Sequence, residues 1–202
     1  MKNLTQFLLS CAVLAVTLVG ASAQVETGKP APDFTLPGSD GQNYALTAYK
    51  GKYVVLEWTN HDCPFVKKHY SGGAMQATQK KYTGKGVVWL QIISSAPGKQ
   101  GYLSAAQATE VNKAQGTAAT ATLLDPDGKV GKLYGAQTTP HMYVIAPDGK
   151  LIYQGAIDDK QSTNPADIAT SKNYVAAALD EAMAGKAVSK PVTKSYGCSV
   201  KY

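Results

Sequence analysis

The sequence contains no arginine, so all 20 of its basic residues are lysines. Bidentate recognition of phosphate groups and of guanine depends on the planar arginine guanidinium, which a lysine ammonium does not replace. The 14 acidic residues leave a formal net charge of +6, and the lysines are mostly scattered along the chain. Scattered lysines are typical of a solvated surface, and we therefore expect no nucleic-acid partner.

The chain also has little continuous hydrophobic sequence. Its one long apolar run covers residues 7–19, which is shorter than the roughly 20 apolar residues of a membrane-spanning helix. Lys2 precedes this run, and Ala21-Ser22-Ala23 follows it as a small-x-small cleavage site. These features predict a signal peptide over residues 1–23, cleaved after Ala23, and a periplasmic or secreted protein that is free of the membrane. An uncleaved anchor is the alternative.

Cysteine is scarce, with three residues in the whole chain. Cys11 lies in the predicted signal peptide, so the mature chain keeps only Cys63 and Cys198. Two cysteines in an exported protein can form a disulfide. Residues 24–185 are enough for one domain with its own core, and residues 186–202 form a tail without clear periodicity that carries Cys198.

The pattern of apolar residues predicts an α/β domain with a mixed central sheet flanked by helices. Its N-terminal part, with two prolines and a turn at residues 37–41, favours a hairpin laid against that sheet. Gly72-Gly73 is a weak point in the first helix, where we expect a kink or a break. The expected strands cover residues 53–59, 87–94, 121–124, 142–145 and 151–154, and the expected helices cover 64–82, 103–115, 130–134 and 174–184.

Cys63 lies where the first central strand runs into a helix that begins at Pro64. Backbone N–H groups and the helix dipole favour negative charge at such a position, and the thiolate is the reactive form of cysteine. His61, Lys67 and Lys68 lie close by in sequence and favour the thiolate, whereas Asp62 opposes it. We therefore expect thiol redox chemistry at Cys63.

Three motifs together resemble the thioredoxin superfamily, and more closely its redoxin branch, the AhpC/TSA or peroxiredoxin-like proteins. They are Ala31-Pro32-Asp33-Phe34, the cysteine between strand and helix, and Thr138-Thr139-Pro140, which precedes the hairpin of the expected strands 142–145 and 151–154. The resemblance implies a thioredoxin-like fold over about residues 28–184 with Cys63 as nucleophile. It also implies a cis-proline at Pro140 that presents the Thr139 backbone to a substrate chain; an ordinary trans-proline is the alternative.

The chain departs from both family patterns. Val66 stands where the second cysteine of a Cys-x-x-Cys motif belongs, Cys63 is not part of a Pro-x-x-x-Thr-x-x-Cys motif, and no arginine is present to hold a peroxide. We therefore expect Cys198 to resolve Cys63, within one chain or across a homodimer, with a permanent structural disulfide as the alternative. The substrate is then a peroxide or a protein disulfide, a thiol protein acts as reductant, and no cofactor is required.

Glu57 lies six positions before Cys63, in the predicted central strand. The resemblance implies a buried acid there that moves protons during disulfide exchange. Burial disfavours an ionised carboxylate and raises its pKa, which suits general acid–base chemistry. A glutamate that faces the surface or the edge of the sheet is the alternative.

All three histidines of the chain fall near the motifs, at His61, His69 and His141. This suggests a rival function, a copper- or zinc-binding protein that uses Cys63, His61 and His141, with Cys198 as a further ligand. No His-x-x-x-His or Cys-x-x-Cys spacing supports it. A thioredoxin-fold binding module without catalytic activity is the third hypothesis.

Overall fold

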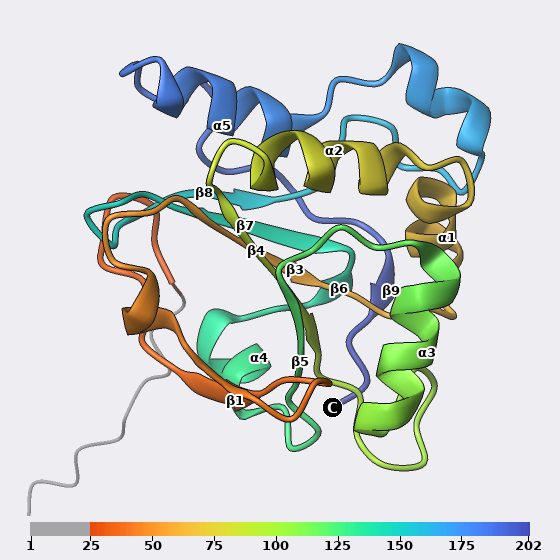
Figure 1. Cartoon of the computed structure of the whole chain (residues 1–202). Helices are drawn as coiled ribbons and strands as arrows, with labels where there is room; N and C mark the ends of the chain where they lie inside the picture. Colours follow the sequence, from red (N-terminus) through yellow and green to blue (C-terminus); the bar gives the residue numbers. More distant parts are fainter. Residues whose placement is uncertain (1–24) are drawn as a thin grey trace, which may run out of the picture.

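The structure is a computed structural model, and it describes residues 25–202 (Figure 1). The predicted signal peptide, its cleavage site after Ala23 and Cys11 lie outside the described residues. Within the described part, no helix is both long enough and apolar enough to span a bilayer.

A five-stranded mixed sheet forms the centre of the domain, with the strand order β5-β4-β3-β7-β8. Neighbouring β3, β4 and β5 are parallel, whereas β7 runs antiparallel to both β3 and β8. All five residues of β3 are buried, as is typical of a central strand covered on both faces. The strands are β3 (Val54–Trp58), β4 (Val88–Ile93), β5 (Ala121–Leu124), β7 (His141–Ile145) and β8 (Leu151–Gly155).

Helices α1 (Pro64–Ser71), α2 (Ala74–Thr83) and α5 (Tyr174–Met183) cover one face of the sheet (Figure 1). The expected break between the first two occurs at Gly72-Gly73, and Gly73 has a φ of 76°, which favours glycine. α3 (Ala105–Gln115) lies at the β5 edge and begins with a capping box at Ser104. The predicted mixed sheet with flanking helices is confirmed.

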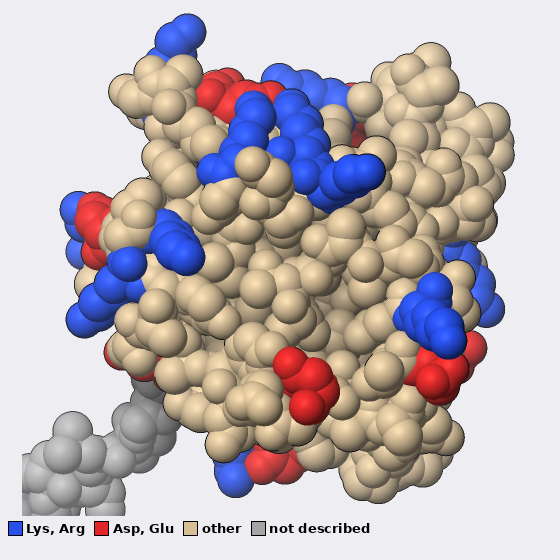
Figure 2. Space-filling model, in the orientation of Figure 1, with Lys and Arg blue, Asp and Glu red and all other residues tan. Residues whose placement is uncertain are grey.

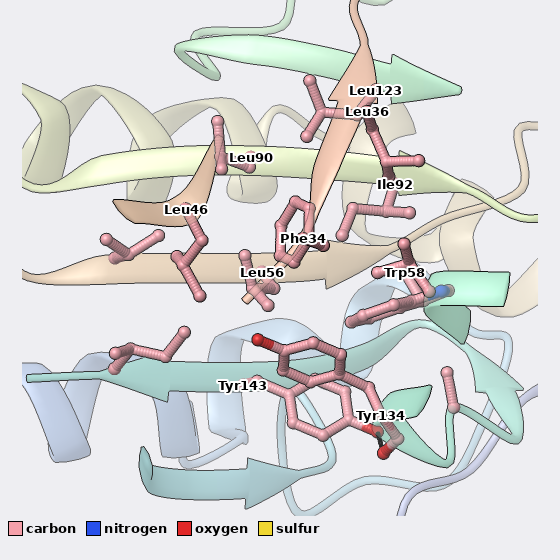
Figure 3. Close-up of a cluster of buried hydrophobic side chains, with 14 of the residues drawn as sticks. Phe34, Leu36, Leu46, Leu56, Trp58, Leu90, Ile92, Leu123, Tyr134 and Tyr143 are labelled. Atoms are coloured by element: carbon pink, nitrogen blue, oxygen red, sulfur yellow. Dashed lines mark hydrogen bonds between the residues drawn. The ribbon is translucent and has the colours of Figure 1, made fainter. Parts of the chain in front are cut away.

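The opposite face of the sheet carries the N-terminal hairpin and α4 (Lys129–Tyr134). The hairpin consists of β1 (Thr35–Pro37) and β2 (Asn43–Ala45), and the 3-10 turn η1 (Leu46–Tyr49) follows it. Trp58 is the aromatic centre of this core, with its ring 5.4 Å from Tyr134 and 5.1 Å from Tyr143, centroid to centroid. Figure 3 shows the side chains that the hairpin and the sheet contribute, among them Phe34, Leu36, Leu46, Leu56, Leu90, Ile92 and Leu123.

The C-terminal tail follows the domain surface in an ordered path, although its sequence predicts no regular structure. After the 3-10 turn η2 (Pro165–Thr170) and α5, residues 191–193 add to the edge of β8 through hydrogen bonds of 3.0 Å between the backbone of Gln154 and both Pro191 and Thr193. Farther along, β9 (Cys198–Ser199) pairs antiparallel with β6 (Thr138–Thr139). This pairing brings Cys198 to Cys63 at the start of α1, and the last residue, Tyr202, lies against α4.

Candidate active site at the start of the first helix

Cys63 is the N-cap residue of α1, and Pro64 occupies the first helical position. Its backbone N–H donates to the Asn60 carbonyl at 3.0 Å, and its carbonyl accepts from the N–H groups of Val66 and Lys67 at 3.0 and 2.9 Å. The proline fits here because the first N–H of a helix has no partner within the helix. The local sequence thus fixes the buried sulphur of Cys63 at the positive end of the helix dipole.

The sulphur atoms of Cys63 and Cys198 lie 2.6 Å apart. No disulfide bond joins them in this structure, but the separation brings the two sulphurs within reach of the about 2.05 Å bond of a disulfide. The carbonyl oxygen of Thr139 lies 3.1 Å from the Cys63 sulphur, and Thr139 is also the strand partner of Cys198. The fold thus brings together three of the residues that the sequence singles out, across 135 positions of the chain.

The two thiols differ in acidity. Burial raises the pKa of the Cys63 thiol, but hydrogen bonds from the Cys198 side chain and from the backbone amides of Val66 and Cys198 outweigh it, so the pKa lies below its usual value. Burial and the neighbouring Cys63 sulphur raise the pKa of Cys198 to about 11. A single negative charge on the pair therefore resides on Cys63, with the proton on Cys198.

The peptide bond between Thr139 and Pro140 is cis, which confirms the expected cis-proline. On the other side of the site, Gly197 has a φ of 139° and lies against the Thr139 carbonyl. A Cβ atom at this position would overlap that oxygen, so only glycine allows β9 to come so close.

Glu57 is fully buried on β3, so the surface alternative is wrong. Its carboxylate accepts hydrogen bonds from Tyr70 Oη at 2.6 Å, Trp89 Nε1 at 2.7 Å and Gln79 Nε2 at 3.1 Å. Burial raises its pKa more than these donors lower it. Gln91 extends the network through its side-chain amide, which donates to the Tyr70 hydroxyl. Within the described chain, these hydrogen bonds lead away from both cysteines rather than to them.

The histidines are not gathered around the thiols. His61 lies 3.5 Å from Asp62, His69 faces Asp158 at 3.8 Å, and His141 accepts from the Gln137 backbone at 3.3 Å. Burial lowers the pKa of His141 to about 4. Among residues 25–202 no group of three or more histidine, cysteine, aspartate or glutamate side chains is arranged to hold a metal ion. The structure therefore does not assemble Cys63, His61 and His141 into the suggested copper or zinc site.

Lys68 is the feature that the sequence did not reveal. Lys67 and Lys68 were both expected to favour the Cys63 thiolate, but Lys68 is buried, and its ammonium donates to Asp158 Oδ2 at 3.0 Å and to the Lys160 carbonyl at 2.7 Å. Tyr196, two residues before Cys198, donates to the other oxygen of Asp158. Burial raises the pKa of Asp158, and these donors outweigh it to leave a net lowering. A lone lysine in a helix carries no pattern that distinguishes it from its exposed neighbour Lys67.

On the face of the molecule that Figure 2 shows, lysine and acidic side chains form small separate groups with uncharged residues between them. One group lies where α2 and α5 meet, since Lys81 and Lys85 lie 3.0 and 3.9 Å from Asp180. This face therefore offers mixed charge rather than a continuous basic surface.

Comparisons with known proteins agree with this geometry. Residues 27–154 match the model of the AhpC/TSA family. An uncharacterized conserved protein from Geobacillus kaustophilus has a similar structure, with a TM-score of 0.76 and 28% identity over 89% of this chain and 94% of that one. A hypothetical protein from Sinorhizobium meliloti 1021 is also similar, with a TM-score of 0.75 and 25% identity over 89% of this chain and 96% of that one.

A third solved structure has a functional description. A candidate thiol:disulfide interchange protein DsbE from Chlorobium tepidum is 26% identical, with a TM-score of 0.51 over 65% of this chain and 85% of that one. No curated protein matches the chain at a significant level.

Proposed function

The chain belongs to the AhpC/TSA family of thioredoxin-fold proteins, and we propose that it is an exported thiol oxidoreductase with Cys63 as nucleophile and Cys198 as resolving thiol. The observation that carries this proposal is the 2.6 Å separation of the two sulphurs at the N-terminus of α1. The same chain supplies both thiols, so the resolving step needs no second copy.

Two first steps are compatible with the site. With a hydroperoxide, the Cys63 thiolate attacks one oxygen and the O–O bond breaks. Cys63 becomes a sulfenic acid, and the leaving hydroxide or alkoxide takes up a proton and departs as water or an alcohol. With a disulfide, the thiolate attacks one sulphur and forms a mixed disulfide while a thiolate leaves.

The second step is the same in both cases. The Cys198 sulphur attacks that of Cys63 and releases water from the sulfenic acid, or the partner's thiol from the mixed disulfide. The Cys63–Cys198 disulfide then accepts two electrons from a thiol reductant protein, which regenerates both thiols.

Glu57 is the proposed proton carrier. Burial raises its pKa, and a raised carboxyl pKa suits general acid–base chemistry. Because its hydrogen bonds go to Tyr70, Trp89 and Gln79, it acts on the sulphurs through an intervening water or donor rather than by direct contact. Thr139 and Pro140 are the proposed docking edge, which lies next to Cys63 and receives a substrate chain when β9 leaves β6.

The decisive experiment is mass spectrometry of the Cys198→Ser variant after mild peroxide and after incubation with an oxidised protein. A sulfenic acid at Cys63 supports peroxide reduction, and a trapped mixed disulfide supports disulfide exchange. If Cys63 remains a free thiol under both conditions, the proposal is wrong and a non-catalytic binding module is favoured.

A redox titration separates a catalytic disulfide from a permanent one. Structural disulfides resist reduction, with potentials below about −300 mV, whereas catalytic ones have higher potentials. A Cys63–Cys198 potential near that of thiol oxidoreductases is the expected result. Export is tested by N-terminal sequencing of the mature protein, which we expect to begin at Gln24.

A further inference from the structure

Two tyrosines fix the C-terminal segment on either side of Cys198 without using its sulphur. Before it, the Tyr196 hydroxyl donates to Asp158, and the Tyr196 ring packs edge-on against Phe65 with centroids 5.8 Å apart. The Asp158 carboxylate is itself fixed by the buried ammonium of Lys68. This first anchor therefore connects the tail to α1, the helix that carries Cys63.

The second anchor is the last residue of the chain. The Tyr202 hydroxyl donates to the Ala136 carbonyl at 2.7 Å, and the ring lies against Gly128 and Gly131 in α4 and its cap. A Cβ atom at Gly131 would come within 2.5 Å of the Tyr202 hydroxyl oxygen and 2.6 Å of its ring. We call this the Tyr202 slot, formed by Gly128, Gly131 and the Ala136 carbonyl.

The backbone between the anchors is paired as well. The N–H of Val200 donates to the Gln137 carbonyl at 3.0 Å, and the Lys201 carbonyl accepts from the Ala96 N–H at 2.8 Å. Together with the β6–β9 pairing, these contacts hold the segment 196–202 along its whole length. None of them depends on the oxidation state of the cysteines.

We propose that Tyr196 and Tyr202 are positioning residues that keep Cys198 on Cys63 while both are thiols. This inference rests on the proposed role of Cys198 as resolving thiol. A flexible tether alone gives an effective concentration in the millimolar range. A docked segment has already lost its conformational freedom, so closure of the disulfide costs little further ordering and is correspondingly more favourable.

The test measures disulfide closure in the full-length protein equilibrated with reduced and oxidised glutathione. In this reaction Cys63 and Cys198 lose two electrons and two protons, and one oxidised glutathione becomes two reduced ones. The closed fraction is counted by acid quenching, alkylation and mass spectrometry. For Tyr202→Ala we expect at least a tenfold lower equilibrium constant, which corresponds to a rise of about 30 mV in the midpoint potential.

A second variant disrupts the contact between Tyr202 and Gly131 by changing the glycine. Gly131→Ala leaves the tail sequence intact and places a methyl group in the Tyr202 slot, where it also comes within 2.9 Å of the Ser94 hydroxyl oxygen. We expect its equilibrium constant for disulfide closure to fall about as much as that of Tyr202→Ala. Because both changes remove the Tyr202 contact, the double variant should lose less than the sum of the two single changes, whereas two unrelated structural defects would add. Tyr102→Ala, at an exposed tyrosine, is the matched control and should behave as wild type.

The outcomes separate this inference from the proposed function. If the wild-type protein forms no Cys63–Cys198 disulfide at any glutathione ratio, the proposed function fails. If the disulfide forms, and Tyr202→Ala and Gly131→Ala both close with the wild-type equilibrium constant, only the positioning role is overturned. Tyr196→Phe, which removes one hydroxyl and keeps the ring, should give a smaller loss of about threefold, in line with a single hydrogen bond.

Discussion

Thr139 and Cys198 are antiparallel strand partners, and the Thr139 carbonyl also lies 3.1 Å from the Cys63 sulphur. One residue of β6 therefore pairs with the Cys198 backbone and places its carbonyl oxygen against the Cys63 sulphur. The tail occupies the strand edge next to the nucleophile, and any extended polypeptide that pairs with this edge has to displace it.

Gly197→Ala should loosen the tail and expose Cys63. A Cβ atom at Gly197 overlaps the Thr139 carbonyl, a backbone atom that cannot move without breaking the pairing of β6 and β9. We expect the reduced variant to be alkylated by iodoacetamide at Cys63 at least tenfold faster than wild type. Gly185→Ala is the control, because Gly185 also has a positive φ of 73° but no atom within 4 Å of its Cβ position. Equal rates in the two variants would contradict the close-approach argument.

Removing the Cys198 thiol should make Cys63 less acidic. The hydrogen bond from Cys198 is the largest contribution that lowers the Cys63 pKa against burial. In Cys198→Ala this donor is lost, so the pKa of Cys63 should rise. In Cys198→Ser a hydroxyl donor remains, and the rise should be smaller. Thiolate absorbance at 240 nm followed against pH measures both variants, and an unchanged titration in Cys198→Ala would contradict the assigned hydrogen bond.

The stability of the protein should fall in mild acid because of buried neutral histidines. Burial lowers the pKa of His141 from 6.5 to about 4. The unfolded chain therefore binds this proton at a higher pH than the folded one, so the stabilisation is present above pH 6.5 and is lost as the pH falls toward 4. At about 1.4 kcal/mol per pKa unit, the loss from one such histidine is on the order of 3 kcal/mol.

His141→Gln tests this directly, because glutamine does not titrate and its side-chain oxygen can accept the Gln137 N–H in place of Nδ1. Urea unfolding between pH 4 and 7 should show a smaller slope of unfolding free energy against pH than in wild type. Part of the slope remains in His141→Gln because burial also lowers the pKa of His69 to about 4. A slope identical to wild type would show that His141 does not contribute.

Much of this fold follows from local sequence. The apolar run before Cys63, the glycine pair after it and the turn before Lys150 predict β3, the break between α1 and α2, and the β7–β8 hairpin. Periodicity determines these features because each one depends on residues that are close in the chain. The burial of Glu57 follows in the same way from its place in a strand of apolar neighbours.

The path of the tail does not follow from local sequence. Its anchors depend on partners far away in the chain, with Tyr196 on Asp158 and Tyr202 on the Ala136 carbonyl. A short polar segment with one proline shows no periodic pattern, so its pairing with β6 and β8 emerges only in three dimensions. The same holds for Lys68, whose burial requires Asp158 and the Lys160 carbonyl from a loop some 90 positions later.

The buried ion pair between Lys68 and Asp158 should be essential to the fold. Asp158→Ala leaves a buried ammonium without its carboxylate, which costs about 3–5 kcal/mol of unfolding free energy. The comparison is Asp180→Ala, which breaks the ion pair of a half-exposed carboxylate with Lys81 and should cost less than about 1 kcal/mol. Chemical denaturation of both variants measures the difference. Similar losses would show that Lys68 finds a substitute partner or reaches water.

Glu57→Gln should slow the redox reaction more than it harms the fold. Glutamine presents an amide N–H₂ where one carboxylate oxygen now accepts from Trp89, Gln79 or Tyr70, so one hydrogen bond is lost at a cost of about 1–3 kcal/mol. The raised pKa of Glu57 means that its stabilisation is present below pH 4.5 and is lost as the pH rises through the folded-state pKa. The variant should lack this pH dependence of stability.

Tyr70→Phe separates a proton-carrying role of Glu57 from mere packing. It removes a hydroxyl of the same network but leaves the titratable carboxyl group in place. If Glu57 carries the proton, the rate of disulfide exchange falls in Glu57→Gln and loses the part of its pH dependence that comes from Glu57, while the part from Cys63 ionisation remains. Tyr70→Phe keeps the Glu57 part, shifted toward higher pH because a donor that lowers the Glu57 pKa is gone. Stopped-flow kinetics of both variants decide the question. If both keep the wild-type pH profile, Glu57 serves only the packing of β3 against α1 and α2.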